Sequence, residues 1–96
     1  MGNNGQIDNA DYYRLPCGRY LEDFIAWRGL DFAEGSALKY CYRAGHKDGE
    51  TADKDLAKMR HYVRFLAARR GQPVEDVEIA VFALYKAAFD WDGEEG

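Results

Sequence analysis

The sequence lacks an uncharged stretch of about 20 residues, the length that a membrane-spanning helix requires. It has two cysteines, Cys17 and Cys41, which fit neither a disulfide framework nor a four-ligand zinc site. Residues 1–11 are rich in glycine and asparagine and contain no apolar run of the kind found in secretory signals. These absences predict a cytoplasmic protein with reduced thiols and no membrane association.

The acidic balance of the chain comes from its end. The 96 residues include 13 basic and 17 acidic side chains, for a formal net charge of −4. Four of the acids lie close together near the C-terminus: Asp90, Asp92, Glu94 and Glu95. Residues 39–70, by contrast, contain nine Lys or Arg against four Asp or Glu. A locally basic segment in an acidic chain argues against binding of duplex DNA and favours a compact anionic ligand such as a phosphate ester.

The composition predicts one folded domain. Apolar residues make up 47% of the chain and aromatic residues 15%, which excludes disorder of the whole chain. We expect a flexible segment over residues 1–11, a single helical domain over 12–90 and an acidic tail over 91–96. Apolar spacing within the domain predicts helices over residues 19–28, 32–44, 52–70 and 73–89. The expected fold is therefore an all-α bundle with a helical hairpin at its core.

Residue types that favour helix ends support these boundaries. Gly29 is expected to end the first helix. Asp31, with Glu34 three residues on, forms a capping box for the second. Thr51 is expected to cap the third helix, and Pro73 to lie in the first turn of the fourth.

The fourth predicted helix is apolar around nearly its whole circumference. Between Val77 and Phe89, only Glu78 and Lys86 carry a charge. A helix of this kind must be buried on all sides, and a four-helix domain of this size cannot easily enclose one of its own helices. We therefore expect residues 74–91 to pack against a second copy of the chain and form a homo-oligomer. A central helix wrapped by the other three is the alternative.

The second predicted helix carries two cations on one face. Lys39 and Arg43 are four residues apart, and Lys47 follows after four more. Such cations are typical of a phosphate clamp, since Arg offers a planar fork and Lys a point charge; a solvated basic face is the alternative. Gly35 costs this helix about 1 kcal/mol relative to alanine. It indicates close approach of a ligand or of a neighbouring helix, and Ser36 beside it offers a hydroxyl group.

The third predicted helix places Asp55, Lys58 and Tyr62 at spacings of three and four residues, beside its apolar stripe. We expect Asp55 to pair with Lys58 or to orient Arg43 across the helix interface. We expect a ring that stacks on a nucleobase to come from one of three residues: Tyr12, Tyr13 and Trp27. For each of them, packing in the core or at an interface is the alternative. The sequence contains no G-x-x-x-x-G-K-[S/T] motif, so ATP is not held by a P-loop.

Two runs of residues resemble a known family. The first is Leu30-Asp31-Phe32-x-x-Gly35-Ser36-x-x-Lys39-Tyr40-x-x-Arg43-Ala44-Gly45-x-Lys47, and the second is Lys54-Asp55-Leu56-x-Lys58-x-x-x-Tyr62. Together they are similar to SaV-like proteins of tailed phages, a family of unknown function. Its best-known relative is a phage early-gene nucleotide kinase that phosphorylates deoxynucleoside monophosphates without a P-loop. The resemblance extends over residues 13–66. With the spacing above, it implies a set of ligand-binding residues: Tyr13, Gly35, Ser36, Lys39, Arg43, Lys47, Lys58 and Tyr62.

The resemblance leaves the activity open. As a nucleoside monophosphate kinase the protein would use ATP and Mg²⁺, with Asp55 as its catalytic carboxylate; otherwise we expect no cofactor. Ser36 and Lys54 stand where the family has Asn and Glu, so fewer groups for phosphoryl transfer are present. We therefore favour a protein that binds a phosphate-bearing nucleotide or nucleotide-derived signal. By analogy with other small phage proteins, we expect it to sequester that ligand and counter the defence of a bacterial host. A factor that binds a host protein through the apolar fourth helix is a further alternative.

Overall fold

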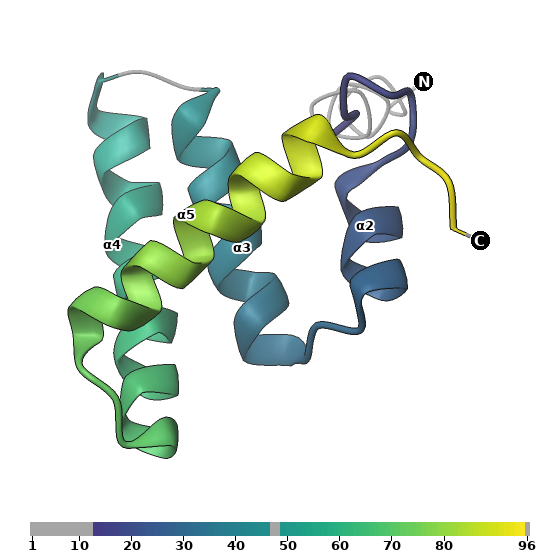
Figure 1. The fold of residues 1–96 in the computed structure, drawn as a ribbon. Coiled ribbons are helices and arrows are strands. Elements are labelled where there is room, and N and C mark those ends of the chain that lie inside the picture. The colour runs from purple at the N-terminus through teal and green to yellow at the C-terminus, as the bar shows by residue number, and fades with distance from the viewer. Residues whose placement is uncertain (1–12, 47–48, 96) are drawn as a thin grey trace.

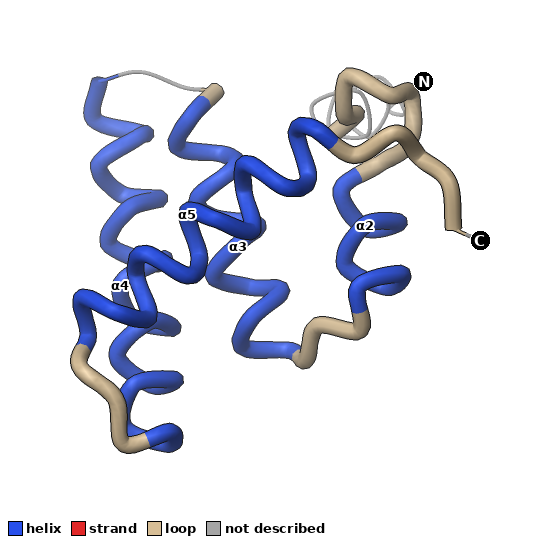
Figure 2. The backbone as a smooth tube through the Cα atoms, in the orientation of Figure 1, coloured by secondary structure: helices blue, strands red, loops and turns tan. Residues whose placement is uncertain are grey.

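The computed structural model describes residues 13–46 and 49–95, whose helices and loops are drawn in Figures 1 and 2. Within these residues the chain forms α2 (Leu21–Arg28), α3 (Phe32–Gly45), α4 (Gly49–Arg70) and α5 (Val74–Asp90). Apart from an isolated bridge between Arg14 and Tyr20, the described residues form no strand pairing. The predicted all-α fold is confirmed. The expected flexible segment over 1–11, Tyr12 and Lys47 lie outside the described residues.

The helices are arranged in two layers. α3 and α4 run antiparallel beside each other, α5 crosses both, and α2 lies on the side of α3 that faces away from α4 (Figure 1). The principal dimensions are 46 × 38 × 19 Å. Because an α-helix with its side chains is about 10 Å across, the shortest dimension accommodates two helices and no third.

One hydrophobic cluster fills the space among α3, α4 and α5. The α3 side of this cluster consists of small residues, which let the neighbouring helices approach closely: Ala33, Ala37 and Cys41. The other two helices contribute larger apolar side chains: Met59, Val63, Leu66 and Val81, with Ala67 and Val77. The stripe of large side chains from α4 thus packs on the small residues of α3, which gives the predicted hairpin core.

A second cluster connects the N-terminal segment, α2 and the end of α5 to the other side of α3. Its buried members are Leu15, Leu21, Phe24, Leu38, Tyr42, Ala88 and Trp91. The Tyr42 hydroxyl, at the centre of this cluster, donates a hydrogen bond to the Arg14 carbonyl at 3.0 Å. The segment before α2 is therefore tied directly to α3.

The predicted helix ends are partly confirmed. Asp31 and Glu34 form the expected capping box, since the Asp31 carboxylate accepts from the Glu34 amide at 2.8 Å and the Asp31 amide donates to the Glu34 carboxylate at 3.2 Å. Gly29 ends α2 in the left-handed region, with φ of 73°. α2 begins at Leu21 instead of residue 19, because the Tyr20 backbone before it is extended and pairs in the bridge described above.

Four other ends differ from the prediction by one or a few residues. α3 includes Gly45 as its last residue. α4 begins at Gly49, so Thr51 lies within the helix and not before its first residue. Pro73 precedes the first helical residue of α5, and that helix ends at Asp90. Differences of one or two residues are usual at helix ends, where the backbone groups lack partners within the helix.

α5 is buried on one side only. Val77, Val81 and Ala88 pack inward, whereas the side chains of Ile79, Phe82 and Phe89 remain 66%, 45% and 45% exposed. The alternative of a central helix wrapped by the other three is therefore wrong, because a molecule two helices thick cannot cover α5 on all sides. We refer to Ile79, Phe82 and Phe89 as the outer face of α5.

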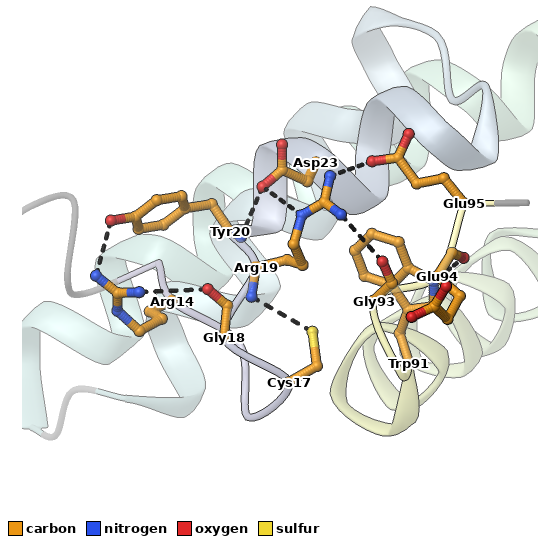
Figure 3. Close-up of polar contacts among 10 residues, drawn as sticks. All are labelled: Arg14, Cys17, Gly18, Arg19, Tyr20, Asp23, Trp91, Gly93, Glu94 and Glu95. Atoms are coloured by element: carbon orange, nitrogen blue, oxygen red, sulfur yellow. Dashed lines mark hydrogen bonds and ion pairs between the residues drawn. The ribbon is translucent and has the colours of Figure 1, made fainter.

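The residues after α5 are anchored to the start of the domain (Figure 3). Arg19 donates to the Gly93 carbonyl at 3.0 Å and forms an ion pair with Glu95. Trp91 is 8% exposed and stacks on Trp27, with 5.1 Å between the ring centroids. The packed domain thus extends beyond residue 90, where we expected an acidic tail, and the Trp27 ring is engaged in packing.

Replacing Trp91 by alanine should lower the free energy of unfolding by about 3–5 kcal/mol, because Trp91 is 8% exposed and packs on the buried ring of Phe24 and the partly exposed ring of Trp27. Phe65→Ala is the control, since Phe65 is 46% exposed; we expect it to change that free energy by about 0.5 kcal/mol. Urea unfolding followed by circular dichroism measures both. Equal effects of the two substitutions would contradict the burial of residue 91.

Candidate functional site

The two cations of α3 converge on one aromatic ring. The Lys39 ammonium lies 5.7 Å from the centroid of the Tyr13 ring. One turn further along α3, the positive charge of the Arg43 guanidinium lowers the pKa of the Tyr13 hydroxyl. Lys39 and Arg43 thus lie on the same side of α3, near a residue from the N-terminal segment.

Arg43 also contacts a carboxylate on α4. Its Nε lies 3.6 Å from Oδ2 of Asp55, which confirms the predicted pairing across the helix interface. Asp55 is 2% exposed, although it is an acid. Lys58, the other predicted partner of Asp55, lies elsewhere, with its ammonium 5.4 Å from the centroid of the Tyr40 ring. We call Tyr13, Lys39, Arg43 and Asp55 the Tyr13 cluster.

The charges of this cluster act on the Tyr13 hydroxyl. Burial raises the pKa of Tyr13 above its ordinary value, the Arg43 guanidinium opposes the rise, and the Asp55 carboxylate adds to it. Tyr13 therefore stays protonated at neutral pH, and its hydroxyl can donate a hydrogen bond.

A surface groove begins at Lys39 and runs along the first half of α3. It has a volume of about 280 Å³, close to the lower limit for a site that encloses a small organic ligand, roughly 300 Å³. The lining side chains come from α2, the α2–α3 loop and α3: Ile25, Leu30, Asp31, Phe32, Gly35, Ser36 and Lys39. Phe32 is 78% exposed. The groove thus has apolar walls, with an uncovered ring on one side and a cation on another.

Gly35 is explained by helix packing. A Cβ atom at this position would lie 3.2 Å from Cγ2 of Ile25, so a larger residue would press against α2. Since Gly35 also lines the groove, the bare backbone there faces both the neighbouring helix and the candidate ligand site. The helix-packing alternative raised from the sequence is therefore sufficient to account for this glycine.

The remaining predicted site residues belong to a second aromatic group. Tyr62 stacks on Tyr40 with 6.1 Å between ring centroids and an angle of 10° between planes, and Phe32 meets the edge of Tyr62 at 6.0 Å. Lys58 lies over Tyr40. Phe32 connects this group to the groove. Sequence reasoning did not assign a role to Phe32 or Tyr40, although Phe32, Ser36 and Lys39 share one helical face by their spacing.

The fold and the site define an all-α protein with a cationic and aromatic surface on its α3–α4 hairpin. A family model described as a protein of unknown function (DUF3310) matches residues 4–64, and the chain belongs to this family. The matched range includes α2, α3, the Tyr13 cluster and the groove, and it ends before α5 begins. No curated protein and no solved structure gives a significant match to the chain.

Two further searches concern other classes of site. In the part of the chain that the structure describes, no group of three or more His, Cys, Asp and Glu side chains is placed to hold a metal ion. The helices of that part include none with the length and apolar character needed to cross a bilayer.

Neither cysteine takes part in the Tyr13 cluster. Cys41 is buried between α3 and α4, and burial raises the pKa of its thiol to about 11. Cys17 is half-buried near Gly93. Since the thiolate is the reactive form, Cys41 is unsuited to act as a nucleophile at neutral pH.

We expect iodoacetamide at pH 8 to modify Cys17 while Cys41 resists. The Cys41 pKa of about 11 leaves roughly one thiolate in a thousand at this pH, and burial further limits access. Peptide mass spectrometry measures the extent at each site, and urea should make the two equal. Rapid modification of Cys41 in the folded protein would contradict its position in the core.

Proposed function

We propose that this protein binds a phosphate-bearing nucleotide or nucleotide-derived signal between the groove and the Tyr13 cluster. The observation that supports this proposal is the position of Lys39, which both lines the groove and lies beside the ring whose hydroxyl Arg43 acts on. Lys39 and Arg43 would bind the phosphate group. The apolar groove, with the exposed ring of Phe32 at its rim, would receive the base.

The site is better suited to holding a ligand than to transferring phosphate. Phosphoryl transfer requires metal ions on the donor, held by exposed oxygen ligands, and a positioned acceptor. Asp55, the carboxylate that the kinase hypothesis would use, is 2% exposed and is paired with Arg43. We therefore propose sequestration of the ligand, and the resemblance to phage proteins suggests a signal of bacterial defence as the target. The kinase remains the second candidate because of that same resemblance.

The first experiment asks which small molecule the protein holds. Protein purified from cells is denatured, and the released compounds are identified by mass spectrometry. A nucleotide released unchanged supports sequestration. Turnover of nucleoside monophosphates to diphosphates with ATP and Mg²⁺, lost in Lys39→Ala or Asp55→Ala, would replace the proposal by the kinase. If no nucleotide is released and none raises the melting temperature, the proposal fails.

For the nucleotide that binds, Lys39→Gln should weaken affinity by roughly tenfold, because one charge-assisted contact to phosphate is lost. The matched control is Lys86→Gln, which removes the same charge from an exposed position on α5, where Lys86 pairs with Asp90. Titration calorimetry measures both affinities. Equal losses in the two variants would indicate a general effect of net charge and would argue against the proposed site.

We further propose that the outer face of α5 binds a second copy of the chain. Ile79, Phe82 and Phe89 recur at spacings of three and seven residues, as on helices that pair lengthwise. In an antiparallel pairing centred on Phe82, Glu78 of one copy, which pairs with Arg60 of its own chain, would face Lys86 of the other, which pairs with Asp90 of its own chain. This charge complementarity favours self-association over binding of an unrelated host protein.

Phe82→Glu should convert an oligomer to a monomer, because it places a charge at the centre of the apolar contact. Phe65→Glu is the matched control: Phe65 is 46% exposed and Phe82 45%, but Phe65 lies on α4. Sedimentation velocity at micromolar concentration measures the mass. A monomeric wild-type protein would overturn self-association, and the outer face of α5 would then be left for the host-factor alternative.

A further inference from the structure

Asp55 is the one charged residue that is buried in the described part of the chain. It lies on α4 within the contact with α3, near the apolar side chains of the first hydrophobic cluster. Removing a carboxylate from water is costly unless opposite charges and hydrogen bonds replace the lost hydration. We call the contact between α3 and α4 the α3–α4 seam. The presence of a buried carboxylate, Asp55, in this seam requires an explanation.

Stability alone does not supply one. Asp55 Oδ2 is fully buried and accepts no hydrogen bond from the described residues, and its distance of 3.6 Å from Arg43 Nε is that of an ion pair only. Apolar residues of similar size in place of a buried ion pair usually leave a protein equally stable or make it more stable. This comparison concerns replacement of both partners, because an apolar residue at position 55 alone would leave the buried Nε of Arg43 facing an apolar side chain.

The pair has a definite effect on Arg43. Asp55 contacts the guanidinium at Nε, which is buried, whereas the Arg43 side chain as a whole is 30% exposed. The same guanidinium acts on the Tyr13 hydroxyl of the N-terminal segment, whose pKa it lowers. An arginine paired with a buried carboxylate loses part of its rotational freedom before any ligand arrives, which lowers the entropic cost of binding.

We propose that Asp55 is a positioning residue that presents the Arg43 guanidinium to a phosphate group at the surface, beside Lys39. This inference rests on the proposed function, since it names the residue that orders the phosphate contact. It also predicts an effect of unusual sign. Removal of a negative charge near an anion site normally tightens anion binding, whereas loss of a positioning carboxylate weakens it.

The test compares three variants with the wild-type protein, with inorganic phosphate as the probe and chloride as the reference anion. Asp55→Asn should weaken phosphate binding by roughly tenfold, the size typical for loss of a group that orients a ligating side chain. Asp55→Leu should weaken it as much. Asp53→Asn is the matched control: it removes the same charge from an exposed position on α4 and should leave binding unchanged. Unchanged or tighter binding in both Asp55 variants overturns the proposal.

A second readout separates this inference from the proposed function. The Nε–H signal of Arg43 in ¹⁵N–¹H spectra, identified by its loss in Arg43→Lys, reports the order of the guanidinium without any ligand. We expect a slowly exchanging signal that Asp55→Asn broadens or shifts toward the free arginine position. No change in this signal overturns the positioning by Asp55. If the signal changes but the wild-type protein binds neither phosphate nor any nucleotide, the proposed function fails and Asp55 is still the residue that orders Arg43.

Discussion

A carboxylate in the seam between α3 and α4 connects the fold of this protein to its surface chemistry. The seam is otherwise formed by small side chains of α3 against larger ones of α4, a contact that fixes the separation of the helices better than their register. The ion pair of Asp55 with Arg43 joins one position of α3 to one position of α4. We infer that this pair favours a single register and, with it, the position of the cation in the candidate site.

The thinness of the molecule explains why two unlike surfaces remain uncovered. With 19 Å along the shortest dimension, each helix of the two layers keeps one side toward solvent. On α3 this side carries Ser36, Lys39 and Arg43, which suit a small anion next to an apolar groove. On α5 it carries Ile79, Phe82 and Phe89, which suit the flat surface of another helix. The chemistry of each side accordingly favours a different kind of partner.

Local features of the fold could be predicted from the sequence, and long-range features could not. The capping box of Asp31 and Glu34 depends on residues three apart, and the Asp55–Arg43 pair follows from two helices that must form an antiparallel hairpin. The burial of Trp91 depends on α2 and the end of α5 meeting in space, for which neither segment carries a local signal. For the same reason, the stacking of Tyr62 on Tyr40 became apparent only once the register of α3 against α4 was known.

The residues proposed to bind the ligand can be assembled from one chain, a question that the sequence alone left open. The groove is lined by α2, the α2–α3 loop and α3, and the Tyr13 cluster adds the N-terminal segment and α4. None of these lining residues comes from α5. Association through the outer face of α5 would therefore bring two complete sites together and would not build one shared site. Each chain in such an assembly should therefore bind the ligand with the same affinity as a single chain. The number of sites should equal the number of copies.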